Sequence, residues 1–275
     1  MGLLMCPPAH YGIEYEINPW MSTRRQSDPQ RARSQWSDLR HILQHRLSLQ
    51  VEFIDAVAEQ PDMVFTANAG LVWRHKFIAS NFRHEVRRGE VPHFIEWFRR
   101  RAFEIVRLPD ELFFEGEGDL LACGDVWFAG YHIRSDVLAH QRVAEIIDAE
   151  VLSLELTNRW FYHLDTCFCP LDAERALYYP PAFDRYGQEV LQSRIAELIP
   201  VCAAEAQRFA CNAIVADNAI VLNEGCPEVR QRLQQLGFTV HETPLDEFIK
   251  AGGSAKCLTL RLDGEEAAAW KQHAR

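Results

Sequence analysis

The chain has 275 residues, of which 48% are hydrophobic, and it carries a formal net charge of −10 at pH 7. This length is enough for one large domain or two modest ones, each with a buried core. The acidic balance argues against a nucleic acid or an acidic membrane as a partner, because phosphate groups bind to basic surfaces. A small cationic substrate is compatible with this charge.

The N-terminal segment gives no sign of export. Residues 1–8 lack the basic start and the long apolar run of a signal peptide. Further along, no uninterrupted apolar segment approaches the ~18 residues needed to span a bilayer. We therefore expect a soluble, cytoplasmic protein in which the 8 cysteines are mostly reduced.

A loose unit recurs along the chain: an amphipathic helical stretch, a strand, a turn, a loop with polar residues and another apolar strand. The arginine-containing segment 22–37 precedes the first such stretch and is expected to be a mobile lid or the start of a helix. Helical stretches are predicted at 39–43, 94–98, 143–147 and 229–233, and the strands after them at 51–54, 103–106, 151–154 and 238–240.

The units can be aligned on Asp62, Glu115, His163, Cys211 and Cys257, each about fifty residues after the one before. In four of the five units the residue at this point is one capable of catalysis or of binding a charged substrate. Repeats of this period indicate units that bury their apolar faces against neighbours, as in propellers. We therefore predict one domain over residues 1–275 with an α/β fold closed into a fivefold ring, which would gather these residues around one axis. An ordinary α/β sheet is the alternative.

Cys257 is the first candidate for catalysis. Gly252 and Gly253 provide a flexible approach to it, and residues 258–260 are expected to form a short strand after it. A thiolate is the reactive form of cysteine, and a nearby cation lowers the thiol pKa. A guanidinium substrate would itself supply that cation. The alternative is a buried thiol with a packing role.

His163 is the second candidate, because histidine titrates near neutrality and can protonate a leaving amine and then activate water. Asp165 lies two positions further on, and in an extended segment the two side chains would share one face. A distant cysteine and histidine together outline a nucleophile and its proton carrier. A core histidine is the alternative.

Two further polar clusters accompany this pair. Glu115, Glu117 and Asp119 form a glycine-punctuated run in which the backbone can turn sharply and expose carboxylates. Asp62 and Asn68 bracket residues 63–66, which are expected to be a strand, so that both side chains reach the same ligand.

With these motifs the chain resembles the guanidino-modifying enzymes, which include arginine deiminases, dimethylarginine dimethylaminohydrolases, amidinotransferases and arginine dihydrolases. The resemblance covers nearly the whole chain. It implies a fivefold α/β-propeller, or pentein, of about five ββαβ-type repeats around a central active site. The motifs that carry it are Pro61-Asp62 with Asn68, the run from Glu115 to Asp119, His163-Leu164-Asp165-Thr166, and Cys257 with its two glycines.

The resemblance also implies a role for each residue. Cys257 would attack the guanidinium carbon, and His163 would act first as general acid and then as general base. Glu115 would orient His163 or bind a guanidinium nitrogen, with Glu117 as the other candidate for this position. Asp165 would pair with the guanidinium, and Arg134 with an arginine of the 83–88 cluster would receive the α-carboxylate. The expected substrate-binding residues are Asp62, Asn68, Arg87, Arg134, Asp165 and Asn18.

Asn68 departs from the motif of the deiminases and dimethylarginine hydrolases, which ends in an aspartate. A carboxylate favours a cationic substrate, whereas an amide hydrogen-bonds equally to a neutral ureido product. Asn68 would therefore retain a citrulline-like intermediate for a second attack. In this respect the chain is most similar to the arginine dihydrolases, which form ornithine, carbon dioxide and two ammonia from arginine.

Two alternatives accompany this reading. The reaction could stop at citrulline, formed from arginine or from a methylated arginine. The chain could also be a non-catalytic binding protein, because the pentein fold hosts one. With any of these functions it could assemble as a homo-oligomer. Cys167 and Cys169 lie near His163 but lack a fourth ligand at the usual spacing, and no glycine-rich nucleotide motif is present. We therefore expect no metal and no cofactor.

Overall fold

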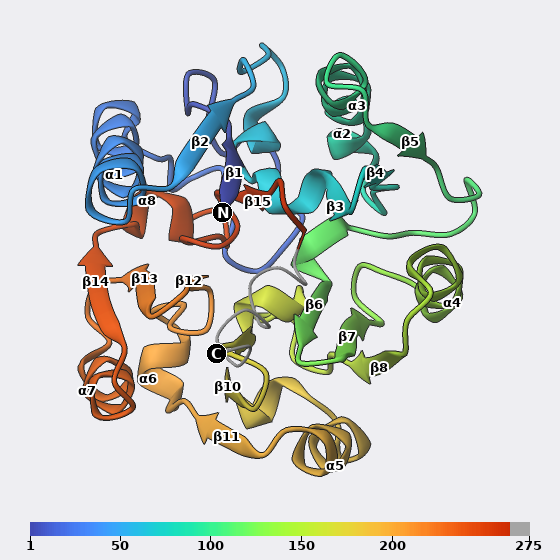
Figure 1. Ribbon diagram of the computed structural model, residues 1–275. Coiled ribbons are helices and arrows are strands. Elements are labelled where there is room, and N and C mark those ends of the chain that lie inside the picture. Colours follow the sequence, from blue (N-terminus) through green and yellow to red (C-terminus); the bar gives the residue numbers. More distant parts are fainter. Residues whose placement is uncertain (265–275) are drawn as a thin grey trace.

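The computed structural model describes residues 1–264, in which the strands form five sheets of three strands around a central axis (Figure 1). In each sheet the middle strand runs antiparallel to one neighbour and parallel to the other. This is the fivefold α/β-propeller expected from the sequence. The part of the predicted domain from 265 to 275 lies outside the described residues.

The strands of each sheet differ in their distance from the axis. Inner strands are β3 (Gly70–Trp73), β6 (Leu120–Cys123), β9 (Phe168–Pro170), β12 (Ile214–Ala216) and β15 (Leu260–Arg261). Middle strands are β1 (Gly2–Met5), β4 (Lys76–Ala79), β7 (Val126–Tyr131), β10 (Arg175–Tyr178) and β13 (Ala219–Asn223). Outer strands are β2 (Gln50–Phe53), β5 (Glu104–Val106), β8 (Val151–Glu155), β11 (Glu197–Pro200) and β14 (Thr239–Thr243).

The two ends of the described chain close the ring. Strand β15 pairs antiparallel with β1, so that Leu3 lies opposite Arg261 and Leu4 opposite Leu260. Strand β1 in turn pairs with β2 in parallel. The first sheet therefore combines strands from both ends of the described chain, and the N-terminus lies near the centre in Figure 1.

Longer helices cover the rim of the ring, and shorter helical turns lie nearer its axis (Figure 1). Rim helices are α1 (Pro29–His41, continued by a π-helical turn at Ile42–Arg46), α3 (Val91–Arg99), α4 (Val137–Ile147), α5 (Arg185–Arg194) and α7 (Pro227–Gln235). Turns that lead into inner strands are η2 (Pro61–Val64), η3 (Thr66–Ala69), η4 (Gly116–Gly118), η5 (Leu164–Thr166), α6 (Ala203–Ala206) and α8 (Asp246–Ile249). Helix α2 (Glu85–Arg88) and turn η6 (Pro180–Ala182) follow middle strands.

The rim helices form where the sequence provides caps and an apolar face. Asp28 caps α1 by accepting hydrogen bonds from the backbone of Gln30 and Arg31. The segment 22–37 therefore contains the start of a helix, one of its two predicted alternatives. In α3 the apolar face packs against its sheet, where the ring of Phe98 stacks on that of Phe77 at 3.8 Å between centroids. Burying one such side chain contributes about 1.5–3 kcal/mol.

Three local predictions are wrong, each in a segment that leads into an inner strand. Residues 63–66 are not a strand, because the chain forms successive 3₁₀ turns η2 and η3 there. His163 is extended but Asp165 lies within turn η5, so the two do not share a strand face. Of residues 258–260 only Leu260 is in a strand. These segments are buried on all sides, so their apolar residues carry no strand periodicity.

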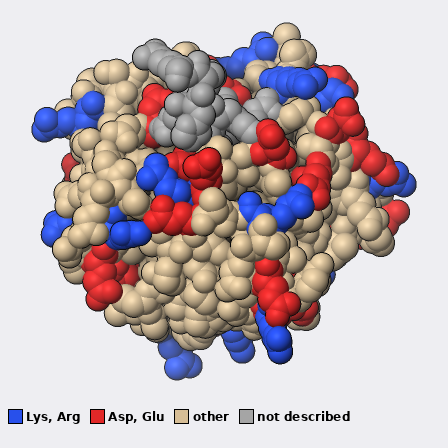
Figure 2. Space-filling model, turned by 60° about the horizontal axis from the view of Figure 1, so that its bottom comes forward, with Lys and Arg blue, Asp and Glu red and all other residues tan. Residues whose placement is uncertain are grey.

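The outer surface carries charges of both signs. On the face shown in Figure 2, Lys and Arg side chains are separated by Asp and Glu side chains and by uncharged residues. Among the helices of residues 1–264, none is long and apolar enough to cross a membrane.

Candidate active site

The turns before the inner strands carry polar side chains to the centre of the ring. There they border a recess of about 250 Å³. Most of the predicted site residues line this recess directly, together with the aromatic rings of Phe65 and Tyr162. The predicted residues among its lining are Asn18, Asp62, Asn68, Arg87, Arg134 and Cys257.

Cys257 lies in a tight turn just before β15, and its side chain faces the recess with 2% exposure. Its Sγ lies 3.3 Å from Oδ2 of Asp165 and 3.1 Å from Nδ2 of Asn212. Burial raises the pKa of the thiol well above its usual value, and the charge of Asp165 adds to this rise. The isolated side chain is therefore a thiol at neutral pH, and a cation in the recess would favour its ionisation.

His163 is held against Glu115, with 2.7 Å between Nε2 and the carboxylate Oε2. Burial lowers the pKa of His163 to about 4, although the hydrogen bond to Glu115 opposes this change. The neutral ring then donates Nε2–H to Glu115, which leaves Nδ1 as an acceptor on the side of Asn68. Nδ2 of Asn68 lies 3.4 Å from Nδ1. His163 therefore presents a basic nitrogen next to the recess.

The structure distinguishes the two candidate glutamates. Burial favours the neutral acid of Glu115, but the charge of Arg134 and the hydrogen bond from His163 hold its pKa well below the usual range. Glu117 points elsewhere, because its Oε2 lies 2.6 Å from Nζ of Lys256 and accepts a hydrogen bond from the backbone of Arg261. Of the two, Glu115 contacts His163.

Two buried arginines line the recess. Nη1 of Arg134 lies 3.0 Å from Oε2 of Glu115, and its guanidinium covers the ring of Tyr162 at 4.5 Å. Arg87 forms a bidentate ion pair with Glu90 and donates a hydrogen bond to Oδ1 of Asn68 at 3.1 Å. Both guanidinium groups are thus fixed in place as candidate receptors for an anionic group.

Within the 83–88 cluster only Arg87 lines the recess. Arg83 pairs with Asp136 at 2.5 Å, and Arg88 donates to the backbone carbonyl of Phe82. Their side chains are partly exposed and stand away from the recess lining. Arg87 is therefore the member of the cluster that matches the predicted position.

Asp62 lines the recess although the strand predicted after it does not form. Its Oδ2 accepts a hydrogen bond from Tyr15 at 3.0 Å, while Oδ1 is buried without a hydrogen-bond partner. Burial raises the pKa of this carboxyl, against the effect of the Arg87 charge. A buried acceptor of this kind suits a ligand ammonium group.

Asn18 lines the recess, but its amide already binds the protein. Its Oδ1 accepts from the backbone of Trp20 and Met21, and its Nδ2 donates to the carbonyl of Ala251 at 3.0 Å. These contacts hold the N-terminal loop against the turn of Cys257. A direct contact between Asn18 and substrate, as predicted, would need one of these bonds to be shared.

Sequence reasoning missed two residues that shape the site, Tyr162 and Asn212. Tyr162 donates to the carbonyl of Gly252 at 2.7 Å, and a Cβ on Gly252 would lie 2.7 Å from the tyrosine oxygen. Gly252 also has φ of 87°, which other residues rarely adopt. Asn212 contacts the Cys257 sulfur directly. Its only signal in the sequence was its place beside Cys211 in the fourth repeat.

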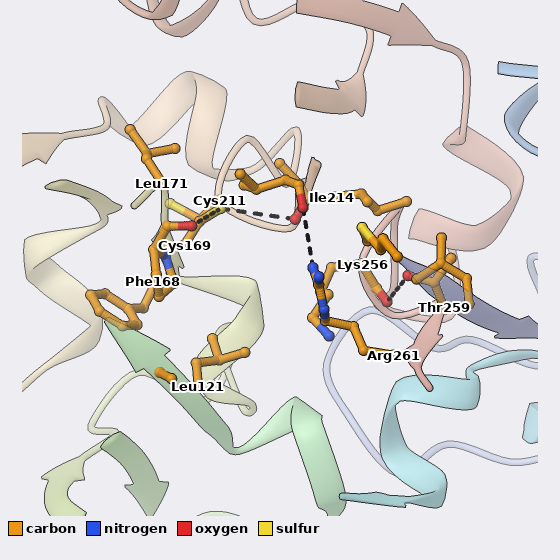
Figure 3. Close-up of a pocket in the computed structure, with 15 residues that line it drawn as sticks. Leu121, Phe168, Cys169, Leu171, Cys211, Ile214, Lys256, Thr259 and Arg261 are labelled. Carbon is orange, nitrogen blue, oxygen red and sulfur yellow. Dashed lines mark hydrogen bonds between the residues drawn. The ribbon is translucent and has the colours of Figure 1, made fainter. Parts of the chain in front are cut away.

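A second cavity lies behind the site, and we name it the axial cavity because inner strands β6, β9, β12 and β15 contribute to its wall. It has a volume of about 510 Å³. Figure 3 shows Cys169, Cys211 and Lys256 on its wall. Within residues 1–264, no three or more His, Cys, Asp or Glu side chains are grouped so as to hold a metal ion.

The propeller fold and the Cys, His and Glu side chains at its centre are those of the guanidino-modifying α/β-propellers. The family model described as "N,N dimethylarginine dimethylhydrolase, eukaryotic" matches residues 15–263. The chain belongs to this family. The resemblance inferred from the sequence is thereby confirmed.

Individual relatives agree with this assignment. The bifunctional arginine dihydrolase/ornithine cyclodeaminase ArgZ of Synechocystis sp. is 45% identical over 265 residues, which are 94% of this chain and 37% of that protein. The chain thus spans well under half of the length of this relative. The N(G),N(G)-dimethylarginine dimethylaminohydrolase of Mycobacterium tuberculosis is 37% identical over 258 residues, 94% of this chain and 84% of that one.

A solved structure extends the similarity to three dimensions. It contains the N-terminal domain of ArgZ, in a variant covalently bound to a reaction intermediate. The TM-score is 0.91 at 44% sequence identity, and the match covers 95% of this chain and 97% of that one.

Proposed function

We propose that this protein is a cysteine hydrolase that converts free L-arginine to ornithine, carbon dioxide and two molecules of ammonia. The observation that carries the proposal is that a thiol and an amide line one recess, and that a histidine held by a carboxylate lies against this amide. The thiol is Cys257, the histidine is His163 with Glu115, and the amide is Asn68. The similarity to ArgZ, an arginine dihydrolase, supports the same activity.

Arginine fits the recess by charge. Its guanidinium would lie against both Asp165 and the Cys257 sulfur, whose Oδ2 and Sγ atoms are 3.3 Å apart and so can contact the same group. Its α-ammonium would meet the free Oδ1 of Asp62, and its α-carboxylate would meet Arg87 and Arg134. Each charged end of the substrate thereby has a buried partner of opposite charge.

The first round makes a ureido product. The guanidinium favours loss of the thiol proton, which Nδ1 of His163 accepts, and the Cys257 sulfur attacks the guanidinium carbon. His163 then transfers that proton to the departing nitrogen, so that ammonia leaves and a thiouronium remains on Cys257. His163 then takes a proton from water, which attacks the same carbon and releases citrulline.

The second round acts on that citrulline before it departs. Cys257 attacks the ureido carbon, a second ammonia leaves, and water releases a carbamate that decomposes to ornithine and carbon dioxide. Two waters are consumed in total. Asn68 supports this round, because an amide can hydrogen-bond to a neutral ureido group without the desolvation cost of an unpaired carboxylate.

A second candidate is hydrolysis that stops at citrulline, from arginine or from methylated arginine. The matching family model and the mycobacterial relative, named as a dimethylarginine dimethylaminohydrolase, favour it. We further propose a cytoplasmic location, because a reactive thiol is kept reduced there. Assembly as a homo-oligomer stays a prediction.

The decisive assay gives the purified protein arginine, citrulline, methylarginines and agmatine separately, and measures all products by mass spectrometry. We expect one ornithine and two ammonia per arginine, and conversion of added citrulline to ornithine. Stoichiometric citrulline that is not consumed would contradict the second round. Faster turnover of methylarginine than of arginine would favour the second candidate.

A further inference from the structure

Asn212 is buried at the centre of the ring, opposite the turn that carries Cys257. It lies just before inner strand β12 and is 0% exposed. Its neighbour Cys211 lines the axial cavity (Figure 3), whereas the Asn212 side chain contacts the active-site turn. The backbone carbonyl of Asn212 also accepts a hydrogen bond from the backbone of Lys256 at 3.2 Å.

The amide of Asn212 uses its full hydrogen-bonding capacity on the active site. Its Oδ1 accepts from the backbone N–H of Ser254 at 3.1 Å and of Cys257 at 3.2 Å. Its Nδ2 donates to the backbone carbonyl of Asp165 at 3.0 Å and to Sγ of Cys257 at 3.1 Å. An amide has two donors and accepts two bonds at its oxygen, so no group is left over.

These contacts fix which end of the amide meets the sulfur. A flipped amide would place its NH₂ against two backbone N–H groups, and a buried mismatch of this kind is costly. Nδ2 must therefore face Sγ. The protein thus presents a hydrogen-bond donor to the nucleophile from a direction set by backbone groups.

The surroundings of the sulfur contain groups that oppose its ionisation to a thiolate and groups that favour it. Burial and the charge of Asp165 both raise the pKa of Cys257, whereas the Asn212 side chain and the Ser254 backbone lower it. Asp62, Arg87 and Arg134 line the same recess. The Tyr162 hydroxyl donates to the carbonyl of Gly252 and is not a donor to the sulfur.

We propose that Asn212 is a further catalytic residue, which holds the Cys257 sulfur in position and stabilises its thiolate through the amide N–H. Asp165 and Asn212 then act on different forms of the nucleophile. The thiol donates its proton toward Asp165, and after ionisation the sulfur keeps the hydrogen bond from Asn212. This inference depends on the proposed function, because that function makes Cys257 the nucleophile.

The chain offers a matched control in Asn223, a second fully buried asparagine, which ends strand β13 next to β12. Its Nδ2 donates to the carbonyls of Arg208 and Glu224, and its Oδ1 accepts from the backbone of Leu245. It therefore holds the chain in the same manner as Asn212 but contacts no sulfur. Substitution of Asn223 reports the purely structural effect of losing a buried amide.

The test measures the ionisation of Cys257 without turnover. The wild type, Asn212→Asp, Asn212→Ser and Asn223→Ser are alkylated with iodoacetamide over a range of pH, and modification is quantified on the Cys257 peptide. The exposed Cys202 provides a reference thiol in every sample. We expect both Asn212 variants to raise the midpoint by about one to two pH units, because a hydrogen bond to a charged group is lost. Asn223→Ser should leave it unchanged.

Activity supplies the second readout. In each Asn212 variant kcat on arginine should fall at least about tenfold with KM changed less, while Asn223→Ser should lose thermal stability but keep kcat. Folded Asn212 variants whose thiol midpoint equals that of the wild type would overturn the proposal. Because alkylation needs no turnover, a normal wild-type titration without arginine hydrolysis would count against the proposed function alone.

Discussion

The recess and the axial cavity lie back to back in the ring, and residues close in sequence face one or the other. Glu115 contacts His163, whereas Glu117 contacts Lys256 on the wall of the axial cavity. In the same way, Cys211 lines the axial cavity and Cys257 lines the recess. The two regions are equally buried, so burial does not separate catalysis from packing. Residues that are only one or two positions apart in the same turn therefore lie on different sides, one next to the recess and the other next to the axial cavity.

The two cysteines test this division most strongly. Cys257→Ser should reduce turnover of arginine by about 10⁴-fold or more, because a buried serine hydroxyl is a poor nucleophile without an activating base. Cys211→Ser should keep turnover within a few-fold, at a stability cost of about 1–2 kcal/mol for the buried hydroxyl. Steady-state kinetics and thermal unfolding of both variants check this, and equal losses of activity would contradict the division.

The two glutamates test it next. Glu115→Gln should lower kcat by about 10²–10³-fold, because His163 loses the carboxylate that orients it. Glu117→Gln should keep kcat within about tenfold. Both variants should unfold at lower temperature, since each glutamine removes a carboxylate that pairs with a buried cation. If Glu117→Gln proves the more damaging to kcat, the assignment of Glu115 is wrong.

Comparison of two buried histidines shows which pKa shifts come from burial alone. Burial lowers the pKa of both His163 and His140 to about 4 from 6.5, but His140 binds Ser153 in the rim and lies outside the recess. Between these pH values the unfolded chain binds a proton that the folded histidine does not, so stability falls as the pH falls.

The measurement compares the wild type with His140→Gln by urea unfolding at pH 7 and pH 4.5. The variant should lose up to about 3 kcal/mol less stability than the wild type on acidification, and it should retain arginine turnover at pH 7. An unchanged pH dependence would show that folding does not lower the pKa of His140.

The Asn68→Asp variant tests whether the protein carries out one or two rounds of hydrolysis on each arginine. The carboxylate should favour cationic arginine over neutral citrulline, so the ratio of ornithine to citrulline should fall by about tenfold or more. Asn218→Asp is the control, because that side chain binds the carbonyl of Gly237 at a surface turn. Product analysis by mass spectrometry gives the ratio, and equal ratios in all three proteins would exclude a role for the amide.

The sequence predicted the ring and most of the recess because both follow from the repeat. Rim helices and outer strands were found at 94–98, 143–147, 103–106 and 151–154, where amphipathic periodicity is strong. The prediction failed in the inner segments. There Asp62 to Asn68 forms 3₁₀ turns, because contacts from several sheets replace the local pattern.

Asn212 shows a second limit of prediction from the sequence. It lies beside Cys211 in the fourth repeat, and the repeat pattern does not distinguish the two positions. Which of these adjacent side chains contacts the Cys257 sulfur follows from the backbone of this turn, where Phe209 has a φ of 60° that the sequence does not reveal. The choice between Glu115 and Glu117 required coordinates for the same reason.

The most direct test of the central claim is to locate the covalent intermediate. Arginine labelled at the guanidino carbon is mixed with the protein, the reaction is quenched in acid within one turnover, and the peptides are mapped by mass spectrometry. The account predicts label on the peptide that contains Cys257 and none in the Cys257→Ser variant. Turnover of arginine with label on another cysteine, or a Cys257→Ser variant that still forms ornithine at the wild-type rate, would contradict it.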